Sequence, residues 1–312
     1  MKPRAFKQVD VFTDQPYFGN PLAVVLDGSG LDDAAMQRFA SWTNLSETTF
    51  LLRPTDAAAD YRVRIFTPDR ELNFAGHPTL GSCHSWLQAG GQPHSKDVVV
   101  QECKVGLVKI RRHDIGAGRQ RQAFAAPPLK RSAISPVLLA KLAAALGLTA
   151  MQITAAQDLN NGLVWLGLLL DSPETVLRIT PDYQALGQLD VHVGVAGIYL
   201  ADAQPALISR ASREARAFGA DPYNTAAAVF KPDVEVRGFV GSTRGYEDPV
   251  TGSLNASLAQ WLMADGYAPE RYAASQGVCL GRAGQVYLER DASGQVWVGG
   301  ETVTCIDGSV TL

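Results

Sequence analysis

The chain has 312 residues, of which 46% are hydrophobic and 19% are charged, and its formal net charge is −3. This is the composition of a folded globular protein, and the length predicts about two domains, each with its own core. The nearly balanced charge excludes the strongly basic proteins that bind nucleic acids or anionic membranes, so we expect neither as a partner.

The first residues and the cysteines predict the compartment. Met1 is followed closely by an alternating strand at residues 6–13, where a secretory signal would have an apolar segment. The cysteines show no C-x-x-C spacing and no grouping with histidines; they are Cys83, Cys103, Cys279 and Cys305. These features predict a cytoplasmic protein with reduced thiols and no membrane-spanning segment.

The first half is predicted to be rich in strands, with two helices. Apolar spacing predicts a helix over residues 31–42, with Asp32 and Asp33 suited to its first turn. Pro78 is expected to open a second helix, over residues 78–87. Strands are expected at residues 6–13, 22–26, 48–52, 61–67, 98–101, 107–111 and 121–125.

Paired prolines mark a linker at residues 126–132, because proline continues neither a helix nor a strand ladder. The second half then opens with a helix that has Ser135 as N-cap, Pro136 at its first position and Gly147 at its end. Further helices are expected at residues 181–186 and 251–264. Strands are expected at residues 151–155, 163–170, 193–200, 206–210, 234–240, 272–275, 285–290, 296–298 and 303–312.

A segment of the first half recurs in the second half. Residues 63–82 resemble residues 236–253, and each copy runs into a predicted helix. Coincidence between two ordinary strand–loop–helix units is the alternative to a duplicated domain with a pseudo-two-fold axis. With one two-residue gap, the identical positions are Val63/Val236, Arg64/Arg237, Phe66/Phe239, Pro78/Pro249, Gly81/Gly252 and Ser82/Ser253.

Each recurring segment ends in a helix that proline is predicted to open. This makes His77 and Asp248 the predicted N-caps, with Pro78 and Pro249 at the first helical positions. Two helix N-termini that meet would form an anion site flanked by an imidazole and a carboxylate. Purely structural roles stay open, because aspartate before proline is an ordinary cap and histidine is common in turns.

Glu47 stands where a helix ends and a strand begins. A glutamate in such a place is commonly solvated surface. If it instead faces a partly buried site, its carboxylate is able to accept and return a proton.

Several other kinds of site find no support in the sequence. There is no G-x-x-x-x-G-K-S/T phosphate loop, no dinucleotide-binding glycine loop, no G-x-S-x-G elbow and no H-E-x-x-H metal motif. His77 and His84 are two helical turns apart, too far to share a metal ion. We therefore expect neither a metal nor an organic cofactor.

Four motifs, taken in chain order, resemble the phenazine-biosynthesis PhzF-like isomerase family. The third is long and specific, and together they span both halves of the chain. They are Phe18-Gly19-Asn20-Pro21; Asn44-Leu45-Ser46-Glu47-Thr48; Arg64-x-Phe66-Thr67-Pro68-x-x-Glu71-Leu72-x-Phe74-Ala75-Gly76-His77-Pro78; and Glu247-Asp248-Pro249-Val250-Thr251-Gly252-Ser253.

The resemblance implies an α+β fold of two pseudo-symmetric domains. Each domain would be a mixed β-barrel around a central helix, as in diaminopimelate epimerase. Residues 1–126 would form the first domain and residues 127–299 the second, with a last strand at about residues 300–312 returning to the first. The family also implies a homodimer.

The resemblance further implies a cofactor-independent isomerase that moves a proton within a small unsaturated or cyclic amino or carboxylic acid. Glu47 would be the general acid/base in an interdomain cleft. His77 and Asp248 would hold polar groups of the substrate and tune Glu47. The remaining residues carried over from the family, as substrate-binding positions, are Asn20, Ser46, Gly76, Gly252 and Ser253.

Two alternatives remain open. One is an amino-acid epimerase or racemase that uses Glu47 and Asp248 as opposed bases, although the related two-cysteine racemases are disfavoured because the cysteines lie outside the motifs. The other is a catalytically silent binding protein of the same fold. Phe239-Val240-Gly241-Ser242 stands where family members often carry a Phe-Ala-Pro turn. The loop at residues 241–246 is expected to border the cleft, so we expect a substrate different from the phenazine precursor.

Overall fold

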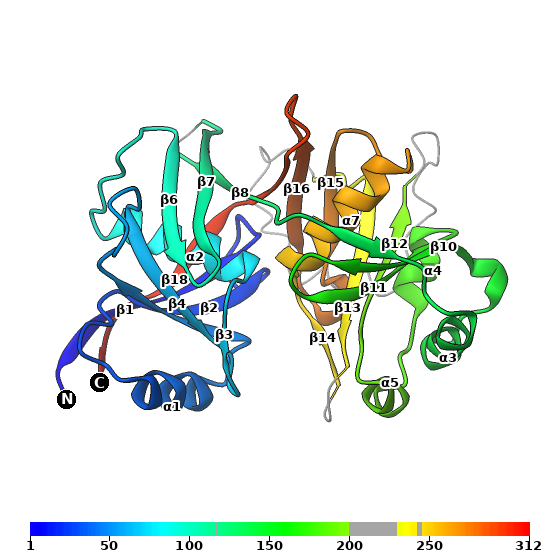
Figure 1. Cartoon of the computed structure of the whole chain (residues 1–312), viewed down its shortest axis with the longest axis horizontal. Coiled ribbons are helices and arrows are strands. Elements are labelled where there is room, and N and C mark those ends of the chain that lie inside the picture. Colours follow the sequence, from blue (N-terminus) through cyan, green and yellow to red (C-terminus); the bar gives the residue numbers. More distant parts are fainter. Residues whose placement is uncertain (117, 200–229, 242–244) are drawn as a thin grey trace, which may run out of the picture. The chain divides into compact units, whose positions relative to one another are not determined.

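The computed structural model describes residues 1–116, 118–199, 230–241 and 245–312 (Figure 1). Its strands and helices form a mixed α+β fold, which confirms the predicted fold class. Contacts between residues divide the chain into two compact units. The first unit comprises Met1–Ala126, Thr251–Ala256 and Glu289–Leu312, and the second comprises Pro127–Val250 and Ser257–Leu288.

The first unit is a mostly antiparallel arrangement of strands with two helices, α1 (Asp33–Thr43) and α2 (Gly76–Gln88). Only the pairs β2–β3 and β4–β6 are parallel among the pairings described for it. Its strands are β1 (Pro3–Val11), β2 (Asn20–Val25), β3 (Glu47–Leu52), β4 (Tyr61–Phe66), β5 (Glu71–Leu72), β6 (Val98–Cys103), β7 (Gly106–Asp114), β8 (Gln120–Ala125), β17 (Val296–Gly300) and β18 (Thr302–Thr311).

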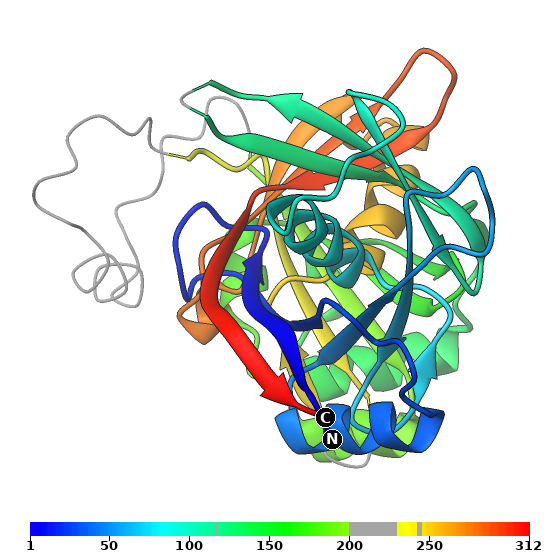
Figure 2. The ribbon, with the colours of Figure 1, turned by 90° about the vertical axis from the view of Figure 1, so that its left-hand side faces the viewer.

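The end of the chain pairs with its beginning. Strand β18 runs antiparallel to β1 over its whole length, from Thr302 beside Val11 to Thr311 beside Pro3. Figure 2 shows these two strands side by side, with both termini at the same end. Strand β17 pairs in the same way with β8, so the last strands complete the first unit.

Helix α2 lies inside the first unit. It contacts β1, β2, β3, β6, β8 and β18 (Figure 2). Its residues from Gly76 to Cys83 are all buried. Most residues in this buried first part of α2 are small or apolar, as expected for a helix segment that faces no solvent.

The start of α2 differs from the prediction. The N-cap is Ala75, in an extended conformation, and not His77, which lies in the first turn. Pro78 is the third helical residue and not the first. The first N–H groups of a helix have no partner within it, so proline fits anywhere in this turn and does not mark its first residue.

The second unit repeats the strand–helix alternation. Its helices are α3 (Pro136–Leu146), α4 (Pro173–Arg178), α5 (Tyr183–Leu189) and most of α7 (Gly252–Ala264), with the 3-10 turns Ala150–Gln152 and Val278–Leu280. Its strands are β9 (Lys130–Ser132), β10 (Ile153–Asn160), β11 (Val164–Leu170), β12 (His192–Ile198), β13 (Val234–Val240), β14 (Tyr246–Asp248), β15 (Arg271–Gln276) and most of β16 (Gly284–Arg290). Leu142, Leu168, Val195 and Phe239 belong to its buried core.

The two units share one order of strand pairing. In the first unit β1–β2 is antiparallel, β2–β3 parallel, β3–β4 and β4–β5 antiparallel, and β4–β6 parallel. In the second, β10–β11, β11–β12, β12–β13, β13–β14 and β13–β15 follow the same succession. A helix follows β5 in one unit and β14 in the other. An internal duplication produces such a repeat.

The strand register corrects the alignment of the two copies. Phe66 pairs with Glu71, and Phe239 pairs with Glu247, so the two glutamates are equivalent. Counted from them, Gly76 and Gly252 are equivalent, and each is the first residue of its helix.

The predicted matches Pro78/Pro249, Gly81/Gly252 and Ser82/Ser253 are therefore wrong. Between the paired phenylalanine and glutamate the second copy has three more residues than the first (239 to 247 against 66 to 71). The gap therefore belongs in this loop of the first copy, whereas the sequence comparison had placed a gap in the second copy. In the corrected register Ser253 is equivalent to His77, and Leu72 is equivalent to Asp248.

Several short elements were not predicted. These are the strands β5, β9 and β14 and the helix α4, which has Ser172 as its N-cap and Pro173 in its first turn. The predicted linker is wrong in part, because Lys130–Ser132 pairs with β10. The predicted strand at residues 206–210 lies outside the described residues, as does the end of the one at 193–200. Across the described part of the chain, no helix has both the length and the apolar character to cross a membrane.

Candidate functional site

The structure brings Glu47 and His77 together. Oε2 of Glu47 lies 3.2 Å from Nε2 of His77. Glu47 is the first residue of β3, and His77 lies in the first turn of α2. His77 is 5% exposed, whereas Glu47 is half-buried. Both atoms of the contact are buried, although the Glu47 side chain as a whole is more exposed than that of His77.

Strand pairing explains why these two residues meet. Strand β2 runs parallel to β3, with Leu22 beside Glu47, so the first residues of both strands lie at one edge. Pro21, the second residue of β2, forms a backbone hydrogen bond with the His77 ring. Because proline offers only a carbonyl, the imidazole is the donor. The site thus joins the starts of two strands and one helix.

The protonation of His77 follows from its surroundings. Burial lowers the pKa of His77 to about 3, against the opposite effect of the hydrogen bond to Pro21. The ring is therefore neutral near pH 7. Nε2 faces Glu47 and makes no hydrogen bond of good geometry, so the donor to Pro21 is Nδ1. Nε2 is then an acceptor, and a hydrogen bond to Glu47 requires the proton to lie on the carboxyl group.

The starts of α2 and α7 touch within the first unit. A Cβ atom on Gly76 would lie 3.0 Å from the Cα of Gly252 and 2.7 Å from Cζ of Phe124. A Cβ atom on Gly252 would lie 3.0 Å from the Cα of Gly76. Glycine at both positions therefore allows two helix N-termini to lie side by side. Their unpaired N–H groups and partial positive charges suit an anionic group.

The other predicted binding residues occupy neighbouring positions. Asn20 is fully buried at the start of β2, and Asp10 accepts a hydrogen bond from the backbone of Gly19 at 2.9 Å, which orders the turn before it. Ser46 directly precedes Glu47, and Ser253 directly follows Gly252; both are half-buried. These polar residues therefore lie at the starts of strands β2 and β3 and of helix α7.

Asp248 lies in the second unit, where it is 9% exposed. Its predicted role as the N-cap of α7 is wrong, because it ends strand β14 and pairs with Gly238. The backbone of Asp248 is held in the strand ladder, and the helix begins only at Gly252. Its carbonyl also accepts a hydrogen bond from Gln276 at 3.1 Å.

A buried polar chain that the sequence analysis missed supports the start of α2. Tyr61 donates to Gln101 at 2.9 Å, Gln101 donates to Thr79 at 3.0 Å, and Thr79 donates to the carbonyl of Ala75 at 2.9 Å. Each of these three side chains is at most 1% exposed. A glutamine at the inward position of an alternating strand was the available signal, because buried polar groups need partners.

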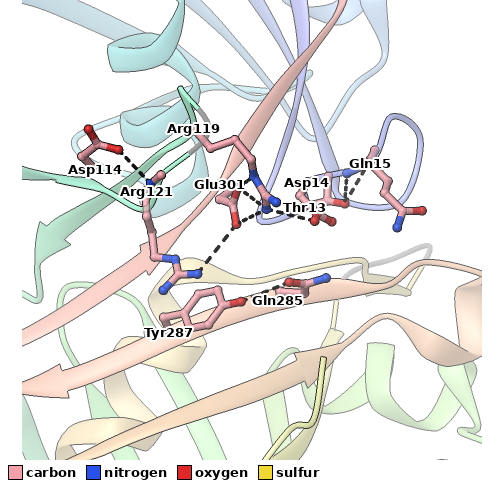
Figure 3. A network of polar contacts seen from close by, with 10 residues as sticks. Thr13, Asp14, Gln15, Asp114, Arg119, Arg121, Gln285, Tyr287 and Glu301 are labelled. Carbon is pink, nitrogen blue, oxygen red and sulfur yellow. Dashed lines mark hydrogen bonds and ion pairs between the residues drawn. The ribbon is translucent and has the colours of Figure 1, made fainter. Parts of the chain in front are cut away.

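A second polar network holds the loop that leads into Asn20. Arg119 binds Glu301 through two hydrogen bonds of 2.8 Å and also contacts Asp14 at 3.0 Å (Figure 3). The carbonyl of Glu301 accepts hydrogen bonds from the backbones of Phe12 and Thr13. This network fixes Phe12 in a left-handed conformation with φ of 65°.

Other chemistries receive no support from the described residues. Within the ranges that the structure describes, no three histidine, cysteine, aspartate or glutamate side chains form a group able to hold a metal ion. All four cysteines are free thiols. Burial raises the pKa of Cys83 in α2, which keeps this thiol protonated and unreactive.

Comparison with known proteins places these motifs in a wider group. A family model described as phenazine biosynthesis-like protein matches residues 9–308. The chain is 32% identical to antisense-enhancing sequence 1 of Schizosaccharomyces pombe, covering 99% of both chains. It is 31% identical to trans-2,3-dihydro-3-hydroxyanthranilate isomerase of Pseudomonas aeruginosa, covering 92% of this chain and 90% of that enzyme.

Solved structures share the fold. A phenazine biosynthesis protein of the PhzF family from Bacillus anthracis matches with a TM-score of 0.77 and 21% identity, covering 100% of both chains. A probable proline racemase from Agrobacterium radiobacter matches with a TM-score of 0.62 and 14% identity, covering 99% of this chain and 93% of that one. At these identities the likeness concerns the fold alone.

Proposed function

Because the chain belongs to the phenazine biosynthesis-like protein family, we propose that it moves a proton within a small carboxylate-bearing substrate and needs no cofactor to do so. Family membership, together with relatives that are named isomerases, confirms the enzyme class predicted from the sequence. The substrate and the residues that act on it are the subject of the proposal.

The observation that carries the proposal is the contact between Glu47 and His77. When Glu47 carries a proton, its carboxyl group is able to donate it to the neutral, buried imidazole, which offers only an acceptor. Such a carboxyl group gives its proton to one carbon of an unsaturated substrate, and the carboxylate then removes a proton from another. General acid–base help of this kind contributes about 10²–10⁴-fold to a rate.

The adjacent helix starts support the choice of substrate class. We propose that the N–H groups at Gly76 and Gly252 bind the substrate carboxylate, with hydrogen bonds from Asn20, Ser46 and Ser253. Donors aimed at a substrate anion also stabilise negative charge that develops when a neighbouring carbon loses its proton. Asp248 completes the proposed set as an acceptor for a substrate amino or hydroxyl group.

We also make a proposal about the architecture of each unit within the α+β fold. We propose that each unit is a mixed barrel wound around a central helix, α2 in the first and α7 in the second. The burial of α2 on all sides and the repeated order of strand pairing support this.

Solvent-hydrogen exchange tests the function. The substrate of the Pseudomonas relative, trans-2,3-dihydro-3-hydroxyanthranilate, would be incubated in D₂O with the protein, alongside other unsaturated cyclic amino acids. We expect deuterium to enter at carbon with one or more of these compounds, and the Glu47→Gln variant to lose this activity while it keeps the fold. Exchange by this variant at the unaltered rate would exclude Glu47 as the proton carrier.

An epimerase is the second candidate. The fold shared with a proline racemase, together with a buried carboxylate at Asp248, favours it. An epimerase would invert a stereocentre, so chiral analysis of products from proline and other amino acids separates the two reactions. A silent binding protein would catalyse neither reaction, yet a ligand at about 100 times its dissociation constant would still stabilise it by about 2.7 kcal/mol.

A further inference from the structure

An arginine–glutamate pair occurs in each unit with nearly the same geometry. Arg64 donates from Nε and Nη2 to the two carboxylate oxygens of Glu71, both at 2.8 Å. Arg237 donates from the same two nitrogens to Glu247 at 2.9 and 2.8 Å. A bidentate pair fixes the orientation of both side chains as well as their separation.

The two pairs also occupy one place in the strand register. In each unit the arginine lies two residues before a phenylalanine, with its guanidinium 5.1 or 4.9 Å from the ring centroid. That phenylalanine is the cross-strand neighbour of the glutamate. The residues are Arg64, Phe66 and Glu71 in the first unit and Arg237, Phe239 and Glu247 in the second.

Each glutamate stands just before a part of the candidate site. Glu71 lies in β5, which leads through a short turn into Gly76 and His77 at the start of α2. Glu247 lies in β14 and is followed directly by Asp248. A change in the position of either short strand therefore moves a side chain of the site.

We propose that the two pairs are positioning clamps. Arg64–Glu71 sets the start of α2 and with it the His77 imidazole, whereas Arg237–Glu247 sets β14 and with it the Asp248 carboxylate. The proposal rests on the proposed function, in which His77 and Asp248 act at the substrate.

The second clamp, Arg237–Glu247, is more deeply buried than the first. The side chains of Arg237 and Glu247 are 5% and 3% exposed, against 15% and 13% for Arg64 and Glu71. Arg237 also donates to the carbonyls of Val176 and Ile179, at 3.1 and 2.7 Å, at the C-terminal end of α4. Water cannot replace a partner lost from this pair.

Both residues of the first clamp, Arg64–Glu71, also form ion pairs with charged residues nearer the surface. Arg64 also contacts Asp33 at 2.7 Å, and Glu71 also contacts Lys104 at 2.6 Å. The two pairs are weak evidence for stability, since partly exposed ion pairs contribute little and replacement of a buried pair by apolar residues is often neutral or stabilising. Fixed geometry next to the site is what the two pairs have in common.

Arginine-to-lysine variants test the proposal, because lysine keeps the charge but cannot form the bidentate pair. The variants are Arg64→Lys and Arg237→Lys, with Arg131→Lys as a matched control. Arg131 binds Asp265 through two hydrogen bonds of 2.8 and 2.6 Å, apart from both short strands. Glu247→Gln, which preserves shape and one acceptor, replaces Arg237→Lys if that variant does not fold.

Nuclear magnetic resonance without substrate gives the first readout. We expect Arg64→Lys to move the ring nitrogen resonances of His77 and to leave the carboxyl carbon of Asp248 in place. Arg237→Lys should do the reverse, and Arg131→Lys should move neither. The two signals are assigned from their disappearance in the spectra of the variants His77→Asn and Asp248→Asn.

Turnover gives the second readout. We expect kcat for deuterium exchange to fall by up to about 100-fold in each clamp variant, as for a small misplacement of catalytic groups. Lower thermal stability with unaltered resonances would overturn the proposal. If the resonances move as expected but the wild type exchanges none of the substrates, the clamps stand and the proposed function fails.

Discussion

Gly76 and Gly252 approach each other so closely that neither position has room for a side chain. We expect Gly252→Ala to push the two helix starts apart, at a cost of about 1–3 kcal/mol in the free energy of unfolding. Exchange activity should be lost as well. Gly308→Ala is the control, because its Cβ would meet nothing within 4 Å. Full activity in Gly252→Ala would show that the close contact between the two helix starts is not needed for the reaction.

Acid should destabilise the fold through one buried and one half-buried histidine, His77 and His84. Burial lowers the pKa of His77 to about 3, and burial with the charge of Lys7 lowers that of His84 to about 4. Between these values and about 6.5 the unfolded chain binds protons that the folded chain does not. The free energy of unfolding should therefore fall as pH falls, by up to about 1.4 kcal/mol per histidine and pH unit.

Urea unfolding at several pH values between about 5 and 7.5 measures this effect. His84→Asn should show a shallower loss of stability in acid than the wild type. His113→Asn is the control, since His113 is exposed in β7. Equal slopes in the wild type and His84→Asn would contradict the expectation.

Glu235 should act in the opposite direction. It is 2% exposed in β13, and burial raises its pKa to about 8, although hydrogen bonds from Tyr199 and Ser275 favour the charged form. Between about 4.5 and 8 the folded chain holds a proton that the unfolded chain releases, so stability falls as pH rises. Glu235→Gln keeps an acceptor without titrating. We expect it to stabilise the protein more at about pH 8 than at about pH 5 in thermal unfolding. An equal effect at both pH values would mean that Glu235 is charged in the fold.

The polar chain beneath α2 should behave as one unit. Gln101→Leu strands the Tyr61 hydroxyl and removes a donor to Thr79, at a cost of about 1–3 kcal/mol. Tyr61→Phe in the same protein removes the stranded hydroxyl, so the double variant should lose less than the sum of the single losses. Chemical denaturation of the four proteins measures the coupling. Additive losses would show that the three groups act independently.

Long, patterned elements were predictable from the sequence. Helix α3 follows from Ser135, Pro136 and Gly147, and each has the predicted capping role. Strands of two or three residues such as β5 and β14 were missed, because so short a stretch shows no periodicity. Their pairing depends on neighbours that are distant in the sequence, which propensity alone cannot supply.

For the candidate site, the sequence was sufficient to predict two residues that meet, but not the alignment of the two copies. The resemblance to a family singled out Glu47 and His77, and the structure puts them in contact. The recurring segment indicated a duplication, but identical letters such as Pro78 and Pro249 misaligned the copies. Only the pairing of Glu71 and Glu247 with their phenylalanines gives the correct register, because loop length varies more freely than strand pairing.

The antiparallel pair of β1 and β18 has a consequence for how the protein is made. Lys7 and Asp307, an ion pair across these strands, are 300 residues apart in the chain. As the chain is synthesised, the edge of β1 stays without this partner until β18 has been made. Such distant pairing slows folding and exposes an edge open to wrong partners. The strands of the second unit, β9 to β16, are all synthesised before β18, so that unit has its set of strands earlier.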